Sequence, residues 1–211
     1  MSQNKLPIRK KRGRPFDEDK LKSIISTAGR LFGENGFERT TIDAISDASG
    51  VTKMSIYSHF KSKEDLFGAT ITSRVEEEFS IENENLNPKN PRDGLAAIAE
   101  KFLTLIRKDE VLGMYRTMFS SALTHQNLCN LFYKNGPLMV HREVAGYLYQ
   151  CNDVGSIEAA DCDFLATQFL SLFTGLPHIE CLLGIKKPTK KEDMDLIKKN
   201  VDFFIKSITN I

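Results

Sequence analysis

A 24-residue stretch, residues 40–63, constrains the fold more than any other part of the chain. Thr41 is a suitable N-cap for a short helix, and Gly50 supplies the left-handed residue at which that helix can end. Thr52 would cap a second short helix, residues 53–59. Two short helices joined by a glycine turn form a helix-turn-helix, with the motif at 40–59, and the second helix of such a motif enters the major groove of DNA.

The outer face of the second helix carries side chains that suit contact with base edges. Lys53 can donate to guanine, Ser55 can bond to several bases, and Met54 can pack on a thymine methyl group. We therefore predict that Lys53, Met54 and Ser55 face the major groove. The bases that they read do not follow from one sequence.

Two further helices are predicted to support this motif. The first starts at Asp17, ends at Asn35–Gly36 and has apolar residues spaced i, i+3, i+4, i+7. The other starts at a capping-box-like Ser62-x-x-Asp65 and is long enough to leave the DNA-binding unit and enter the next one. The chain would then hold a basic disordered arm (1–16), a DNA-binding domain (17–79) and a regulatory domain (80–211).

The order and spacing of several short motifs across this region are specific. They are Ala28-x-x-Leu31-Phe32, Gly36-Phe37-x-x-Thr40-Thr41, Gly50-Val51-Thr52, Ile56-Tyr57-x-His59-Phe60 and Lys63-Glu64-Asp65-Leu66-Phe67. Together they resemble the N-terminal domain of the TetR family of bacterial transcriptional regulators, over about Asp17 to Phe79. Ser46 and Ser49 depart from the alanines usual there. The resemblance implies that Thr41, Thr52, Tyr57, His59 and Lys63 position the protein on the DNA backbone.

The charge is distributed unevenly along the chain. Residues 1–63 hold thirteen Lys and Arg against seven Asp and Glu, and the remainder holds sixteen against twenty-one. A basic front and an acidic back suit a nucleic-acid reader joined to a domain that stays off the nucleic acid. The alternative is chance asymmetry of a solvated surface.

Residues 1–15 contain six basic residues and no acidic one. Within them, Arg12-Gly13-Arg14-Pro15 resembles the core of an AT-hook, in which two arginines reach into a narrow minor groove. We therefore predict DNA contacts for Arg12 and Arg14. The alternative is a generic basic tail that adds affinity for phosphates only.

The rest of the chain predicts helices and no strand, so the expected fold is all-α with about nine helices. Asn90–Pro91 would start one helix, Gly136–Pro137 would kink or split another, and Pro177 would bend or break a third. Thr189-x-x-Glu192 is a capping box for the last helix.

Met and aromatic residues cluster in the middle of this regulatory domain. Such a cluster is ordinary core or, as in TetR-like proteins, the wall of a cavity for a small, often apolar inducer, with Tyr115 and Tyr133 as polar groups. The predicted lining is Phe102, Ile106, Met114, Tyr115, Met118, Phe119, Phe132, Tyr133 and Met139.

The last two apolar helices are expected, by the same resemblance, to pair with their copies in a homodimer. One helix-turn-helix contacts only half of an operator, so a second copy is needed for specific binding. The predicted interface is Phe169, Phe173, Leu176, Val201, Phe204 and Ile208.

Enzymatic chemistry is poorly supported. The four histidines lie on separate predicted elements without metal-ligand spacing, and no nucleophile motif or phosphate loop is present. We expect no enzyme activity, no catalytic residue, no metal and no cofactor.

The basic N-terminus lacks the apolar segment of a secretory signal, and no apolar run approaches the ~20 residues of a membrane span. A cytoplasmic protein with no membrane partner is expected.

These observations predict a homodimeric TetR-like regulator, most often a repressor in that family, which binds a near-palindromic double-stranded operator and is released by an unidentified small molecule. One alternative is a constitutive DNA-binding protein without an inducer. Others are a helical enzyme or carrier for an apolar ligand, and a redox sensor based on the four widely spaced cysteines. The operator, the regulated genes and the direction of regulation do not follow from the sequence.

Overall fold

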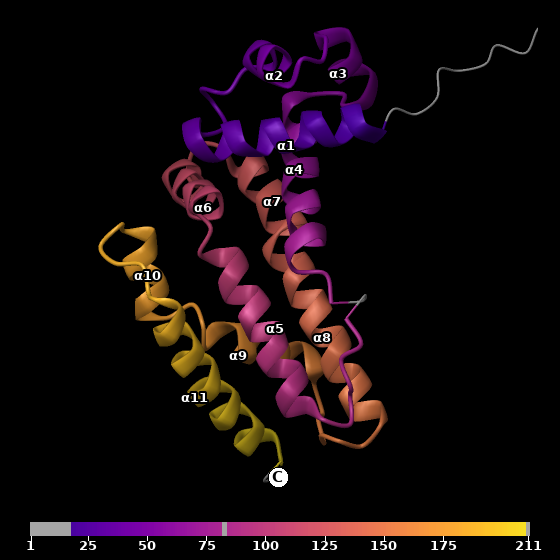
Figure 1. The fold of residues 1–211 in the computed structure, drawn as a ribbon, viewed down its shortest axis with the longest axis vertical. Helices are drawn as coiled ribbons and strands as arrows, with labels where there is room; N and C mark the ends of the chain where they lie inside the picture. The colour runs from indigo at the N-terminus through magenta and orange to yellow at the C-terminus, as the bar shows by residue number, and fades with distance from the viewer. Residues whose placement is uncertain (1–17, 82–83, 210–211) are drawn as a thin grey trace, which may run out of the picture.

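The computed structural model describes residues 18–81 and 84–209, and the helices of this part of the chain confirm the all-α prediction. They are α1 (Glu18–Asn35), α2 (Ile42–Ser49), α3 (Lys53–His59), α4 (Lys63–Glu78), α5 (Pro91–Ile106), α6 (Asp109–Ser121), α7 (Gln126–Asn135), α8 (Pro137–Asp153), α9 (Cys162–Ser171), α10 (Leu176–Leu182) and α11 (Lys190–Thr209). The helices α1, α2 and α3 form one end of the molecule, and α4 runs from that end into the body (Figure 1).

The described residues form more helices than the nine or so expected. Gly136–Pro137 splits the helix predicted around it into α7 and α8, because Pro137 begins a new helix. The helix predicted to contain Pro177 also divides, into α9 and α10, but Pro177 is not the residue that breaks it. The helix α9 ends at Ser171, and Pro177 lies in the first turn of α10, where its missing N–H is not needed.

The caps read from the sequence are present. The side chains of Thr41, Thr52 and Ser62 accept hydrogen bonds from the N–H groups of Ala44, Ser55 and Asp65. Gly50 ends α2 with φ of 68°. Thr189 and Glu192 bond reciprocally as a capping box at α11. These short-range signals mark where α2, α3, α4 and α11 begin. The start predicted at Asp17 lies outside the described residues.

Two hydrophobic cores fill the molecule. One centres on Phe32 and Phe67, whose rings meet edge to face at 5.2 Å, and it also includes Met114, Met118 and Phe132 from α6 and α7. The other lies among α5, α8, α9 and α11. The core below the helix-turn-helix is therefore completed by helices from the second half of the chain, which ties the two parts together.

The contact between α1 and α6 is a close approach of two glycines. A Cβ added to Gly113 would lie 2.5 Å from the carbonyl oxygen of Gly33. A Cβ on Gly33 would lie 3.0 Å from the Cα of Glu110. Only residues without a side chain allow the two backbones to pack this closely. The end that carries α2 and α3 is thus held to the body at α6 as well as through α4.

Candidate nucleic-acid interface and interior cavity

The helix-turn-helix has the geometry of a DNA-reading motif. Ile56 is fully buried and Phe60 is 7% exposed, so one face of α3 is anchored in the core. The opposite face is open, with Met54 84% exposed and Tyr57 55% exposed. The outer face of α3 is therefore free to meet another molecule, as the second helix of a DNA-reading motif requires.

The polar side chains of α3 already have partners within the protein. Lys53 pairs with Asp43 of α2, and the hydrogen bond to this carboxylate raises the pKa of the ammonium group. The Thr52 hydroxyl donates to the Ser55 hydroxyl at 3.2 Å. Contact with a base would require Lys53 to leave Asp43. The base-reading roles of Lys53, Met54 and Ser55 stay predictions.

The predicted backbone contacts differ in their surroundings. Thr41, Thr52, Tyr57 and His59 are exposed on α2 and α3 or at their caps. Lys63 instead donates from Nζ to the carbonyl oxygen of Phe37 at 3.0 Å, with Nζ 4.1 Å from the centroid of the Phe37 ring. Its cation supports the turn after α1 in addition to any contact with phosphate. Arg12 and Arg14 lie outside the described residues.

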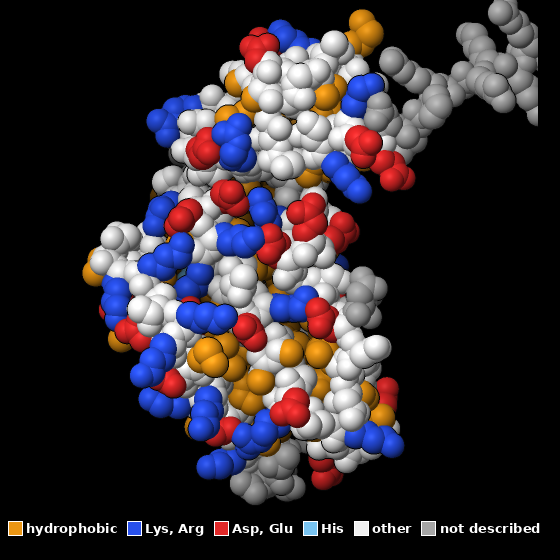
Figure 2. All heavy atoms as spheres, in the orientation of Figure 1, with side chains coloured by type: hydrophobic (Ala, Val, Ile, Leu, Met, Phe, Trp, Pro, Cys, Tyr) orange, Lys and Arg blue, Asp and Glu red, His pale blue; other side chains and the backbone are white. Residues whose placement is uncertain are grey.

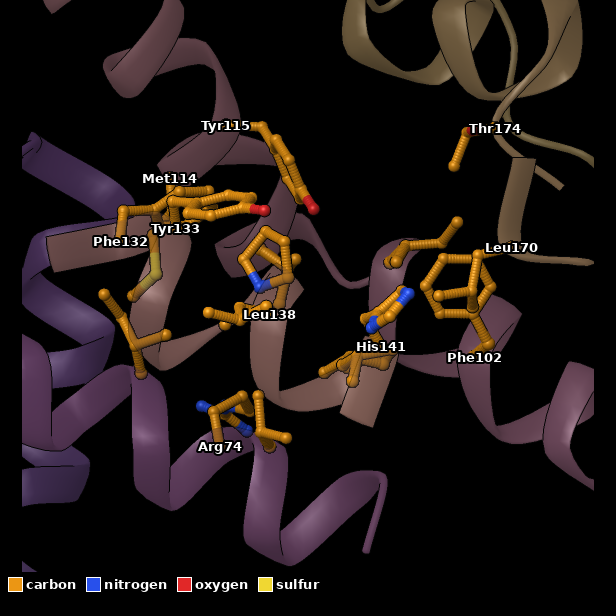
Figure 3. Close-up of a pocket in the computed structure, with 18 of the residues that line it drawn as sticks. Arg74, Phe102, Met114, Tyr115, Phe132, Tyr133, Leu138, His141, Leu170 and Thr174 are labelled. Carbon is orange, nitrogen blue, oxygen red and sulfur yellow. The ribbon is translucent and has the colours of Figure 1, made fainter. Parts of the chain in front are cut away.

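A cavity of about 300 Å³ lies between α4, α5, α6, α7, α8 and α9 (Figure 3). Six residues of the predicted pocket line it: Phe102, Ile106, Met114, Tyr115, Phe132 and Tyr133. In the view of Figure 3, Tyr115 and Tyr133 are drawn above the opening, and Arg74 is drawn below it, where α4 passes. Burial raises the pKa of Tyr115 to about 12. Its hydroxyl, like that of an ordinary tyrosine, is protonated at neutral pH and can donate a hydrogen bond.

Three residues of the predicted lining do not border this cavity. Met118 is one helical turn beyond Met114 and packs in the core that also holds Phe32. Phe119 is 64% exposed on the outer side of α6. Met139, on α8, packs against the core that lies among α5, α8, α9 and α11. The apolar stripes identified helices that border the cavity. Within each stripe, however, only the residues next to the cavity line it.

The polar lining that comes from α4, α8 and α9 is absent from the predicted set. Arg74 lies on α4 between the apolar positions Ile71 and Val75, and all three border the cavity. His141 accepts or donates a hydrogen bond at 3.1 Å to Thr167 across the α8–α9 contact. A charged residue flanked by two inward apolar positions of a helix is the signal that could have identified Arg74.

The predicted dimer interface is wrong in five of its six residues, because these residues face inward within one protomer. Phe169, Phe173, Val201, Phe204 and Ile208 are each at most 3% exposed. Only Leu176, on α10, is open, at 76% exposed. Both α9 and α11 are apolar on more than one face, so helical spacing did not reveal which face meets the core.

Two other faces of the last helices remain apolar and open. A groove between α9 and α11 is bordered by Phe164, Leu172 and Phe203, and both Phe164 and Phe203 are more than half exposed. On the other side of α11, Met194 borders a shallow strip against α5. Orange side chains gather over the lower half of the molecule, where α5 and α11 lie (Figure 2).

A buried polar cluster joins α5, α10 and α11. Arg107 pairs with Asp193 through Nη2 at 2.9 Å and donates from Nη1 to the Cys181 sulfur at 3.0 Å. His178 is 5% exposed beside the Tyr115 ring, and burial together with the charge of Arg107 lowers its pKa. The cluster fixes α10 against the body.

The structure offers little for the alternative chemistries. No group of three or more metal-ligating side chains occurs within residues 18–81 and 84–209. The four thiols are unpaired, and burial raises the pKa of Cys151 and of Cys162. No helix of the described part is long and apolar enough to cross a bilayer.

Comparison with known proteins covers both halves of the chain. Residues 24–70 match the model of "Bacterial regulatory proteins, tetR family", and residues 93–207 match that of "AefR-like transcriptional repressor, C-terminal domain". The HTH-type regulator YdeS of Bacillus subtilis is 39% identical over 72 residues, which are 32% of this chain and 36% of YdeS. The negative regulator of the icaADBC biofilm operon, IcaR of Staphylococcus epidermidis, is 30% identical over 80 residues, which are 38% of this chain and 43% of IcaR. The chain therefore spans less than half of the length of these relatives.

Solved structures match over nearly the whole chain. A TetR-family regulator from Mesorhizobium loti has a TM-score of 0.76 at 21% identity, covering 93% of this chain and 100% of that one. The flavonoid-responsive regulator FrrA has a TM-score of 0.69 at 29% identity, covering 91% of this chain and 98% of that one.

Proposed function

The chain belongs to the TetR family of bacterial transcriptional regulators, and from this premise we propose that it is a homodimeric, cytoplasmic repressor released from a near-palindromic operator by a small molecule. The observation that carries the proposal is the link between the exposed reading face of α3 and the cavity. The helix α4 begins directly after α3 and borders the cavity with Ile71, Arg74 and Val75. A ligand in the cavity can therefore displace α4, and with it the position of α3 on the DNA.

DNA reading falls to α3 and its surroundings. Lys53, Met54 and Ser55 would face base edges, and Thr41, Thr52, Tyr57, His59 and Lys63 would position the motif on phosphates. The 84% exposure of Met54 supports its packing on a thymine methyl group. In the free protein Asp43 keeps Lys53 paired. To contact a base, the Lys53 ammonium group would have to exchange Asp43 for an acceptor on the DNA. Sequences that offer no good acceptor at this position would therefore be bound less tightly.

We assign the dimer contact to the groove that Phe164, Leu172 and Phe203 border on α9 and α11. A second copy is the occupant that suits it, because two recognition helices are needed to read both halves of a palindrome. Phe164 and Phe203 would supply the apolar centre that an obligate interface requires.

Phe203→Glu should convert the dimer into a monomer, as measured by sedimentation equilibrium. Met194→Glu is the matched control, because it adds the same charge on another face of the same helix. If Phe203→Glu stayed dimeric while Met194→Glu dissociated, the interface would lie on the α5 side instead.

The small molecule would bind in the cavity between α4 and α9. Its lining is mostly apolar and aromatic, with Tyr115 and Tyr133 as hydrogen-bonding groups. FrrA is described as flavonoid-responsive. That likeness favours an aromatic molecule with hydroxyl groups as one candidate.

Selection of bound fragments from randomised and genomic DNA tests the proposal as a whole. The selected sites should share an inverted repeat whose half-sites are spaced by one helical turn of DNA or a multiple of it, about 34–36 Å per turn. Lys53→Ala should relax the preference at one or two positions of each half-site. Recovery of DNA without any shared sequence would support a constitutive binder instead.

A further inference from the structure

The cavity contains one permanently charged side chain among the described residues that line it. That residue is Arg74, and no Asp or Glu borders the opening. A cationic ligand in the cavity would lie beside this guanidinium and would find no carboxylate among the bordering side chains, which disfavours it. A neutral or anionic molecule would not be repelled by the guanidinium.

Arg74 is held at the edge of the cavity by two carboxylates. Its Nη1 lies 3.3 Å from Glu78, one turn along α4, and its Nη2 lies 3.1 Å from Glu110 of α6. The Arg74 side chain keeps about a quarter of its surface exposed. A guanidinium fork can bind a planar anion with two parallel hydrogen bonds, so it is well suited to a carboxylate that arrives from the cavity.

The two carboxylates are not equally bound. Glu78 also accepts from Lys108, and although burial alone would raise the pKa of Glu78, the bonds from Lys108 and Arg74 lower it. Glu110 is more exposed than Glu78, with 36% of its side chain open. Loss of Arg74 would therefore cost Glu110 little, because water can solvate it.

From this geometry we infer that the cavity takes an apolar molecule ending in a carboxylate or a similar planar anion, and that the anion replaces Glu110 on Arg74. The inference rests on the proposed function, because it identifies the ligand class of the same cavity. The apolar body of the ligand lies against Phe102, Ile106 and Phe132, and its far end reaches the hydroxyls of Tyr115 and Tyr133.

The exchange also gives the ligand a route to the DNA-binding end. Arg74–Glu110 is an ion pair between α4 and α6, and the backbone of Glu110 is the contact point of Gly33 on α1. When the anion takes Arg74, α4 loses this link to α6 while α6 keeps its contact with α1. The helices α4 and α6, which both support the helix-turn-helix, can then shift relative to each other.

Matched ligands test the inference without knowledge of the natural one. Phenylbutyl and decyl skeletons, each ending in a carboxylate, an alcohol or an amine, are titrated into the full-length protein by calorimetry. The carboxylate should bind at least tenfold more tightly than the alcohol on one skeleton or both, and the amine should bind least. Equal affinities for the three end groups, or no binding of any, would overturn the inference.

Variants identify the residue that reads the anion. Arg74→Gln should reduce carboxylate affinity to that of the alcohol and leave alcohol binding within twofold. Arg142→Gln, an exposed arginine of α8 outside this cavity, should leave both unchanged. Glu110→Gln should strengthen carboxylate binding, because the competing carboxylate is gone. Equal effects of Arg74→Gln and Arg142→Gln would contradict the role of Arg74.

Operator binding measured in the same samples separates this inference from the proposed function. Carboxylate binding that depends on Arg74 but leaves operator affinity unchanged would support the ligand class and refute release by the ligand. Release of the operator by these molecules in Arg74→Gln as in the wild type would support regulation by the cavity and refute the anion site.

Discussion

The glycine contact between α1 and α6 allows a direct test of how the body holds the DNA-binding end. In Gly113→Ala the new Cβ would lie 2.5 Å from the Gly33 carbonyl oxygen, a backbone atom that cannot rotate away. Contacts below 3.0 Å are essentially not seen and ordinary ones begin near 3.4 Å, so α1 and α6 must separate by about 0.5–0.9 Å. Overpacking of this kind costs about 1–3 kcal/mol, and the better helix propensity of Ala offsets about 1 kcal/mol of that.

The expected result is a small loss of stability with a disproportionate loss of operator affinity. A displaced α1 tilts α2 and α3, and shifts in such coupling elements change affinity by about 0.5–2 kcal/mol, or roughly 2- to 30-fold in Kd. Chemical denaturation gives the free energy of unfolding. Fluorescence anisotropy with a labelled operator gives Kd, and it is measured at a temperature well below that of unfolding.

Gly146→Ala is the matched control, because a Cβ at this α8 position meets nothing within 4 Å. It should be neutral or slightly stabilising and should leave Kd unchanged. If Gly113→Ala bound the operator as tightly as Gly146→Ala does, the α1–α6 contact would not set the position of the DNA-binding end, and the reasoning would fail.

Three further predictions address the interface, the arm and the buried histidine. Tyr57→Ala should weaken binding to all DNA sequences alike in anisotropy titrations, whereas Lys53→Ala should also lose discrimination between operator variants; identical profiles would refute the base-reading role of Lys53. Deletion of residues 1–14 should cut affinity most for operators flanked by A·T tracts, and no dependence on the flanks would refute the minor-groove arm. The pKa of His178 is lowered by burial and by Arg107, so as pH falls below the ordinary histidine value of 6.5 the unfolded state takes up the proton first. Stability of the wild type should therefore fall with pH below 6.5, and denaturation curves of His178→Gln should show a shallower decline; parallel declines would contradict it.

Local signals in the sequence predicted the fold well because they act over a few residues. Thr41, Thr52 and Ser62 cap their helices by bonding to N–H groups three positions on, and Gly50 takes a conformation that other residues avoid. These features depend on chain geometry alone. Pro177 shows the limit, because a proline that can break a helix can also begin one.

The candidate sites were harder to predict, because they depend on which helices become neighbours. Met114 and Met118 share one apolar stripe, yet only Met114 borders the cavity, while Met118 packs entirely within the core that also holds Phe32. Phe203 and Phe204 are adjacent in the sequence, but Phe204 is buried and Phe203 is open. Arg74 gains its position from pairing with Glu110, 36 residues away, which no helical period reveals.

The specificity of DNA binding as a function of salt concentration distinguishes a regulator released by a ligand from a constitutive DNA-binding protein. Affinities for the selected operator and for random DNA of equal length are compared between 50 and 200 mM salt, with and without a cavity ligand. A ligand-released regulator should prefer the operator by a factor of at least about 10³, in the range of specific regulators, and should lose this preference when the ligand binds. A similar affinity and salt slope for both DNAs, unchanged by the ligand, would contradict it.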